Sequence, residues 1–299
     1  MFLFVFLEKY SKIISDSFTG YAGYLWQEIT SPALNSYFYW LVGVSLLVWT
    51  LELVLPWRKH QKAFRKDFWL DAFYMFFNFF LFSLIAYNAI SNVAVELFND
   101  FLAVFGTTNI VAIEIDRWPA WLQLFLLFVL ADFIQWNTHR LLHTVPWLWE
   151  FHKLHHSVKE MGFAAHLRYH WMETIVYKSI QYLPLAMIGY SLLDFFAVHI
   201  FALAIGHLNH ANLNWNYGPL KYIFNSPRMH IWHHARALPA QHRHGVNYGI
   251  SLSIWDYLFK TAYTPNEGRD IELGFNDDKD YPTGFARQLI YPLKLKVKK

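Results

Sequence analysis

The sequence predicts an all-α integral membrane bundle of about four to five membrane-embedded helices, closed at one end by a histidine-rich helical cap. Hydrophobic residues make up 55% of the chain and charged residues only 16%, which is far from the composition of soluble globular proteins. Of 16 histidines, 15 lie between His139 and His244, and many of them are spaced three or four residues apart, as on one face of a helix. Composition therefore predicts the membrane helices, and the histidine spacing predicts the cap.

The first elements follow from runs of apolar residues. Residues 1–7 are apolar but lack the basic leader and small-residue cleavage site of a secretory signal, so we expect an interfacial segment. A membrane core of about 30 Å needs about 20 residues of helix. Three stretches meet that length, at residues 36–55, 68–90 and 118–136.

A fourth apolar stretch, residues 175–205, is interrupted midway by Pro184 and Gly189. By itself this pattern fits either one long tilted span or a helical hairpin. The choice between them depends on which side of the membrane holds the histidines.

Loop charges predict the orientation of the bundle. Residues 58–66 carry five positive charges between the first two spans, and the positive-inside rule places this loop in the cytoplasm. The next loop should face the other side, because it carries the acidic residues Glu96, Asp100, Glu114 and Asp116. The third span then returns to the cytoplasm just before His139.

This orientation favours the hairpin. If residues 175–205 crossed the membrane once, the later histidines would emerge on the opposite side from the earlier ones. We therefore expect two short helices, about 174–189 and 192–206, which allow a partly re-entrant hairpin. The resulting prediction is a protein of the bacterial inner membrane or the endoplasmic reticulum whose histidine-rich site faces the cytoplasm.

No linker, repeat or low-complexity tract divides the chain, so we expect a single domain over residues 1–299. It comprises an N-terminal transmembrane region, residues 1–129, a core at about 130–261 and a polar tail at 265–299. The tail is expected at the surface because it contains Asp277, Asp278 and Asp280.

Ten histidines form four groups that predict a shared metal centre. Imidazole is the commonest ligand for iron, zinc and copper, and two six-coordinate metals offer about twelve positions. A lone histidine is more often a hydrogen-bonded core residue, which is how we interpret His166 and His199. The candidate ligands are His139, His143, His152, His155, His156, His207, His210, His230, His233 and His234.

Ligating imidazoles need partners on their second nitrogen, which orient the ring. Asp132 is the strongest such candidate, because a carboxylate near the end of a membrane span is costly unless it is paired or functional. The alternative for each candidate is a helix cap or a surface contact. The candidates for this supporting role are Asp132, His170, Glu173, Asn209, Asn247 and Asp256.

The ligand chemistry narrows the possible metals. The chain contains no cysteine, which excludes disulfides, iron–sulfur clusters and thiolate-ligated haem or zinc. It also lacks the H-E-x-x-H motif of zinc hydrolases. A histidine-only site at a membrane surface fits iron and O₂ acting on a C–H bond of a membrane lipid.

The histidine motifs resemble those of the fatty acid hydroxylase and sterol desaturase superfamily of membrane di-iron oxygenases. The resemblance runs over about residues 130–261 and rests on H-x-x-x-H at His139–His143 and on H-x-x-H-H at His152–His156 and His230–His234. It implies two iron ions, O₂ as cosubstrate, and hydroxylation or desaturation of a sterol, fatty acyl, sphingoid or ether lipid. Trp171 replaces the proline of the family's Arg-x-His-Pro-x-Glu stretch, so His170 is expected to support the site without binding metal.

Electrons must come from elsewhere, because the 299 residues show no dinucleotide-binding fingerprint and no attached haem domain. A cytochrome, a ferredoxin or a reduced pterin docking at the cytoplasmic face would supply them. Nucleic acid is not an expected partner. The competing hypotheses are a non-enzymatic membrane haem electron carrier, which crowded histidine triplets fit poorly, and a metal transporter, whose ligands would follow the membrane pathway.

Overall fold

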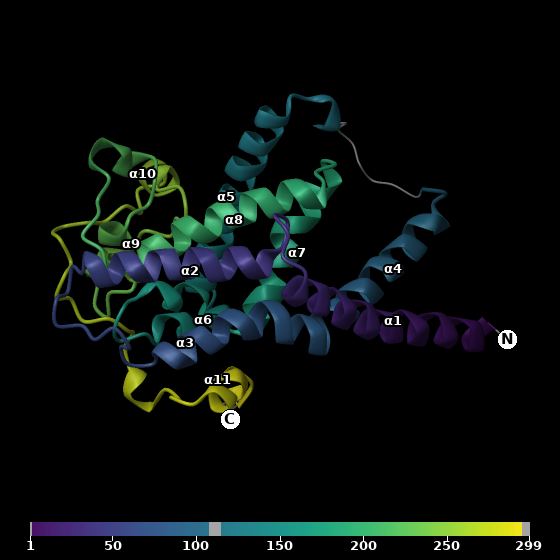
Figure 1. Cartoon of the computed structure of the whole chain (residues 1–299), viewed down its shortest axis with the longest axis horizontal. Helices are drawn as coiled ribbons and strands as arrows, with labels where there is room; N and C mark the ends of the chain where they lie inside the picture. Colours follow the sequence, from purple (N-terminus) through teal and green to yellow (C-terminus); the bar gives the residue numbers. More distant parts are fainter. Residues whose placement is uncertain (1, 108–114, 295–299) are drawn as a thin grey trace.

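The structure, a computed structural model, describes residues 2–107 and 115–294. Over these ranges the chain is helical, and its β-structure is limited to two isolated bridges, Phe224 to Leu252 and Ala235 to Leu273. Figure 1 shows the arrangement of the helices. In chain order the α-helices are α1 (Phe2–Thr30), α2 (Tyr37–Val54), α3 (Phe68–Phe76), α4 (Asn88–Val104), α5 (Ala120–Thr144), α6 (Pro146–His156), α7 (Trp171–Met187), α8 (Leu192–His210), α9 (Pro227–His233), α10 (Ile254–Leu258) and α11 (Phe285–Ile290).

Three helices in the described part of the chain are long and apolar enough to cross a membrane. They are Tyr37–Val54, Phe68–Val104 and Ala120–Thr144, which confirms the three predicted spans with later ends for the second and third. The second is continuous from α3 to α4 through two π-helical segments, Phe77–Leu81 and Ser83–Tyr87. The side chain of Asn78, in the first of these segments, donates to the Tyr169 carbonyl at 2.8 Å. This bond ties the irregular part of the helix to the loop before α7.

The fourth apolar stretch is a hairpin, as predicted, formed by α7 and α8. The chain reverses at Gly189, whose φ of 90° is readily available only to glycine. Ser191 then caps α8: its hydroxyl accepts from the Asp194 N–H, and the Asp194 carboxylate accepts from the Ser191 N–H. Pro184 lies inside α7 and does not mark the turn.

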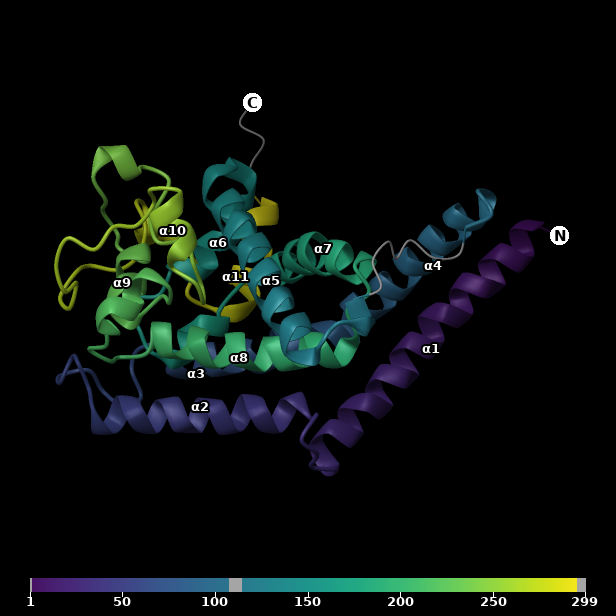
Figure 2. The ribbon, with the colours of Figure 1, turned by 90° about the horizontal axis from the view of Figure 1, so that it is seen from above.

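The N-terminal part differs from the prediction. Residues 1–7 are expected to be a short interfacial segment, but α1 continues for 29 residues and packs along α4. Glu96 and Asp100, expected in a loop, lie on α4 and pair with Lys9 of α1 at 2.8 and 2.7 Å. Figure 2 shows α1 and α4 extending away from the end that holds α9 and α10. Glu114 lies outside the described residues.

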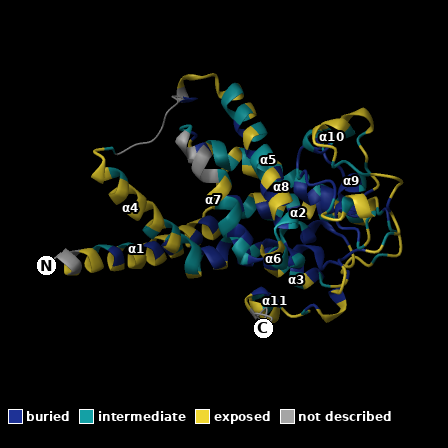
Figure 3. Cartoon of the chain, turned by 180° about the vertical axis from the view of Figure 1, so that it is seen from behind, coloured by how far each residue is buried: buried dark blue, intermediate teal, exposed yellow. Residues whose placement is uncertain are grey.

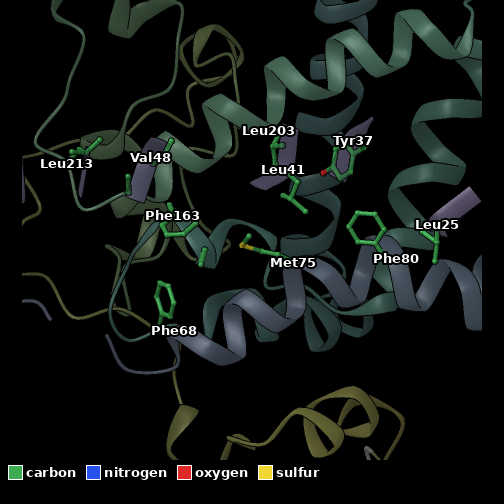
Figure 4. Packing of buried hydrophobic residues seen from close by; sticks show 12 residues of the cluster. Leu25, Tyr37, Leu41, Val48, Phe68, Met75, Phe80, Phe163, Leu203 and Leu213 are labelled. Atoms are coloured by element: carbon green, nitrogen blue, oxygen red, sulfur yellow. The ribbon is translucent and has the colours of Figure 1, made fainter. Parts of the chain in front are cut away.

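Apolar side chains hold the bundle together where α2, α3 and α8 meet. Figure 4 shows Leu41 and Val48 of α2, Met75 of α3 and Leu203 of α8 packed with Phe163. The outer side of α2 leaves other large apolar side chains exposed, Leu46, Leu47 and Leu53 among them. Such a surface fits a hydrocarbon environment, in which apolar side chains need no protein cover.

The C-terminal tail is not the simple surface segment that the sequence predicts. Asp278 is buried, and so are the apolar residues Leu273, Phe275 and Tyr281, although Asp277 and Asp280 are exposed. The Gly274 N–H donates to the carbonyl of His234 at 3.1 Å. The tail folds back because its apolar residues, spaced between the aspartates, bury themselves against the cap.

Candidate metal centre

The two H-x-x-H-H motifs lie on short helices with proline at the first position. Pro146 begins α6 and Pro227 begins α9, where the missing proline N–H costs no hydrogen bond. Ser226 caps α9 by accepting from the Met229 N–H at 3.3 Å. These local signals fix both motifs as helical, so each triplet presents its rings to one side.

The described histidines form two groups, and in each group the ligand nitrogens lie within 4.8 Å of one another. The first group is His139, His143, His152, His156 and His233, and the second is His155, His210, His230 and His234. Each H-x-x-H-H triplet is therefore divided between the two groups. His152 and His156 belong to the first group and His155 to the second, whereas His233 belongs to the first and His230 and His234 to the second. Eight of these nine side chains are buried and His143 is half-buried. Figure 3 shows buried residues gathered around α6, α8 and α9.

The spacing of the Nε2 atoms fits metal coordination. Nε2 of His139 lies 3.1 Å from that of His152 in the first group, and Nε2 of His210 lies 3.1 Å from that of His230 in the second. Two imidazole nitrogens bound side by side to an octahedral metal, with bonds of about 2.1 Å, are separated by about 3.0 Å. The structure thus brings donor atoms to the separation that one shared ion requires.

The opposite ring nitrogens determine which tautomer is present. Nδ1 of His139 lies 2.7 Å from the Tyr248 carbonyl, and Nδ1 of His233 lies 2.7 Å from the Val246 carbonyl. Because a carbonyl only accepts, Nδ1 carries the proton and Nε2 presents its lone pair to the cluster. Nε2 of His233 is buried and has no hydrogen-bond partner among the described residues. Clustered buried lone pairs need a cation, so the donor set fits metal ions.

The protonation state also suits ligation. Burial, reinforced by the neighbouring imidazoles, lowers the pKa of His156, His233 and His234 well below the ordinary value. These rings are therefore neutral at physiological pH, which is the form that binds metal.

The comparisons with known proteins agree with this geometry. Residues 124–261 match the family model for fatty acid hydroxylase. The chain is 35% identical over 184 residues to the ornithine lipid hydroxylase OlsE of Rhizobium tropici, covering 62% of this chain and 54% of that protein. It is 34% identical over 144 residues to human alkylglycerol monooxygenase, covering 47% of this chain and 30% of that protein.

Residues 124–261 therefore form a domain of the fatty acid hydroxylase family. The chain matches about half the length of the first of these relatives and about a third of the second. No solved structure matches it. The matched residues, which we call the hydroxylase domain, contain all nine grouped histidines.

His207 does not join either group of the hydroxylase domain, contrary to the prediction. Its Nδ1 lies 2.8 Å from Nδ1 of His166, and its Nε2 lies 3.1 Å from the hydroxyl of Ser45 on α2. Two side chains three residues apart on an α-helix point in directions that differ by about 60° around the helix axis. His207 therefore points towards α2, while His210 faces the second group. His166, interpreted as an ordinary core histidine, fits beside α8 because Gly206 has no Cβ to occupy its place.

Glu173 contacts a grouped histidine, which is the position that the predicted orienting role requires. Its Oε2 lies 2.7 Å from Nδ1 of His152, with both side chains buried, and its Oε1 accepts from the His170 N–H at 3.0 Å. A carboxylate behind a ligating imidazole fixes the ring and increases its basicity.

Asp132, Asp256 and Asn247 act one step further out, on the backbone of residues 246–252. Asp132 accepts from the Leu252 N–H at 3.2 Å, and Asp256 accepts from the Tyr248 N–H at 2.9 Å. Asn247 donates to the Met229 carbonyl of α9 at 2.8 Å. These bonds position the Val246 and Tyr248 carbonyls that hold His233 and His139, and Asn209 adds a bond to the Ile250 carbonyl of the same segment.

His170 lies away from both groups. Its Nε2–H donates to the Leu289 carbonyl at 2.8 Å, and its Nδ1 accepts from the Met172 N–H at 3.1 Å. The ring therefore fastens the C-terminal helix α11 to the start of α7. The ring supports the hydroxylase domain through the tail, and only the backbone N–H of His170 contacts Glu173 beside His152.

Sequence reasoning missed Arg168 and Tyr248, which contribute backbone carbonyls to the site. The Arg168 carbonyl lies 3.1 Å from Nδ1 of His155, and its buried guanidinium pairs with Asp71 at 3.0 Å. A backbone carbonyl is present in every residue type, so no sequence signal identifies Tyr248 or Val246. Arg168 could have been noticed, because it is the arginine of the stretch that resembles Arg-x-His-Pro-x-Glu.

Proposed function

We propose that this chain is a membrane di-iron oxygenase that hydroxylates a lipid. The observation that carries the proposal is the convergence of nine histidines of the described chain into two groups, at one end of a bundle of apolar helices. The lipid hydroxylase and monooxygenase named among its relatives support the reaction class.

Two iron ions would supply the chemistry by binding and reducing O₂ next to the substrate. The first group would hold one ion and the second group the other. The reaction inserts one atom of O₂ into a C–H bond and releases the other as water, which consumes two electrons and two protons. A cytochrome, a ferredoxin or a reduced pterin would supply the electrons.

The protein residues hold the ligands and limit water. Glu173 and the backbone carbonyls of Val246, Tyr248 and Arg168 hold the proton on Nδ1 of their histidines, which keeps each Nε2 free to bind. Trp149 covers the first group, with its ring 5.0 Å from that of His143. Burial of this kind strengthens electrostatic interactions and suppresses side reactions with water.

The substrate would be a lipid, because the grouped histidines lie at the end of apolar helices whose outer faces expose apolar side chains. The carbon that is oxidised, and whether it is hydroxylated or desaturated, depend on how that lipid lies against the metals. We further propose that the site faces the cytoplasm, since the basic loop at residues 58–66 lies at the same end as α9.

Metal analysis of the full-length protein tests the metal centre. We expect about two irons per chain and no haem absorption band, whereas a Soret band would replace the proposal with a haem electron carrier. Lipid profiling of cells with and without the gene tests the reaction. A lipid product one oxygen heavier is expected, and the absence of a mass change in every lipid class would contradict a lipid oxygenase.

A further inference from the structure

A cationic cavity lies behind the metal centre, on the outside of the cap. It has a volume of about 460 Å³ and is formed by the start of α3, the end of α6 and the folded-back tail. Its lining includes Ser157, which directly follows His156, and Arg168, whose carbonyl holds His155. The cavity is thus adjacent to both histidine groups without including any of their members.

The lining has more positive than negative charge. Five cationic residues line the cavity, Lys66, Lys159, Arg168, Arg236 and Lys279, against three acidic residues, Asp67, Asp278 and Glu272. Asp278 is shared, because it pairs with Lys159 and also with Arg236 at 3.2 Å. Lys66 and Lys279 are exposed at the cavity and form no ion pair with any residue that the structure describes.

Arg168 provides a second, independent observation. Its side chain is 2% exposed, and its Nη atoms bind Asp71, Asp67 and the hydroxyl of Ser157. Its Nε is buried and has no hydrogen-bond partner within the described ranges. Arg168 thus places a guanidinium with one unsatisfied, buried donor beside the cavity, which favours an oxyanion there.

We propose that this cavity binds a phosphate group. Phosphate matches the site because its oxygens can bind several cationic donors at once, and guanidinium and ammonium groups both recognise it. A concave site reaching the buried side chain of Arg168 fits a small anion better than the flat surface of an acidic protein. The phosphate can come from a lipid headgroup at the membrane surface or from solution. The proposal does not depend on the oxygenase reaction.

The test measures binding of two probes, inorganic phosphate and dihexanoyl phosphatidic acid, to the full-length protein in uncharged detergent by calorimetry. The pocket variant is Lys66→Gln with Lys279→Gln, and the matched control is Lys59→Gln with Lys62→Gln, from the same basic loop but outside the cavity. We expect the pocket variant to weaken binding about tenfold, as for the loss of charge-assisted contacts, and the control to leave it unchanged.

The two probes distinguish the sources. Saturable binding of phosphatidic acid with weak binding of inorganic phosphate supports a lipid headgroup, and equal binding of both supports a soluble phosphate. The proposal is overturned if the wild-type protein binds neither probe, or if both double variants weaken binding equally. An effect of the pocket variant on reduction by an acidic electron-transfer protein, without phosphate binding, would also overturn it. Melting temperatures of both variants verify that they are folded.

Discussion

At the residue scale, His207 and His210 are two histidines of one motif with different surroundings. They lie one helical turn apart on α8, yet His210 faces the second group and His207 faces Ser45 and His166. A motif alone treats the two alike. Their different partners make them a matched pair for mutation.

We predict that His210→Ala removes metal from the second group, whereas His207→Ala leaves the metal content unchanged. The reason is that His210 offers Nε2 to the cluster while both nitrogens of His207 are engaged elsewhere. Metal per chain, measured on purified protein, checks this. Equal metal loss in both variants would restore His207 as a ligand.

Glu173 is the second residue whose substitution should change metal binding. We predict that Glu173→Ala lowers metal affinity about 10- to 100-fold, as is typical when the partner of a ligating imidazole is lost. Glu173→Gln should lose less, because its amide oxygen still accepts from His152. Metal titration measures the effect, and Glu150→Ala, which removes a pair with Lys153, is the control. Unchanged affinity in Glu173→Ala would show that His152 needs no carboxylate.

At the scale of elements, helix ends and loops decide how the histidines meet. The end of α5 contributes histidines to the first group and the end of α8 to the second, whereas the short helices α6 and α9 contribute to both. The segment at residues 246–252 then locks two of the rings through its carbonyls. The tail is a further element of this kind, because its attachment depends on the neutral ring of His170.

The attachment of α11 should depend on pH. Burial lowers the pKa of His170 from 6.5 to about 4, and its neutral ring both donates to Leu289 and accepts from Met172. Because the folded pKa is the lower one, this stabilisation is complete above pH 6.5, declines as pH falls below 6.5, and is lost as pH falls through about 4. Protonation of Nδ1 would set it against the Met172 N–H.

Hydrogen exchange of the α11 amides at pH 7, 5.5 and 4 measures this effect. We expect protection to fall with pH in the wild-type protein. In His170→Gln the same exchange, corrected for its intrinsic pH dependence, should change less. A pH response of equal size in both proteins would assign the effect to other histidines.

At the scale of the whole molecule, the chain is polarised along the bundle. The histidines, the basic loop and the cationic cavity lie at one end, and the paired helices α1 and α4 project from the other (Figure 2). The five positive charges of the basic loop predict that this end lies at one membrane face, although Glu96 and Asp100 of the predicted acidic loop lie on α4. The side of the membrane is a separate prediction.

The absence of native cysteine allows that side to be measured directly. We predict that a single cysteine at Lys62 reacts with a membrane-impermeant maleimide only after the cytoplasmic face is opened. A cysteine at Thr107 should react from the outside of intact cells or vesicles. The reverse pattern would invert the orientation while leaving the fold as it is.

Much of the fold followed from local patterns that need no tertiary information. The three spans, the α7–α8 hairpin and both histidine helices could be predicted because apolar length, loop charge and the three- and four-residue spacing of the histidines can be read from the sequence. The extent of α1 and the burial of the tail could not be, because they depend on pairing with α4 and on packing against the cap. The nine grouped histidines are all among the ten predicted ligands, but neither the separation of His207 from them nor their division into two groups was predicted.

By itself, the sequence determined that this protein has apolar helices, that its metal ligands are nitrogen atoms, and that its histidines are spaced to share helix faces. Only the tertiary structure decided that His155 leaves its triplet to join His210, that His207 turns towards α2, and that carbonyls of Val246 and Tyr248 set the tautomers. The physical reason is that helical periodicity dictates the direction in which a ring points from its own helix. The partner that the ring meets, and therefore its role, depends on how separate elements are placed in space.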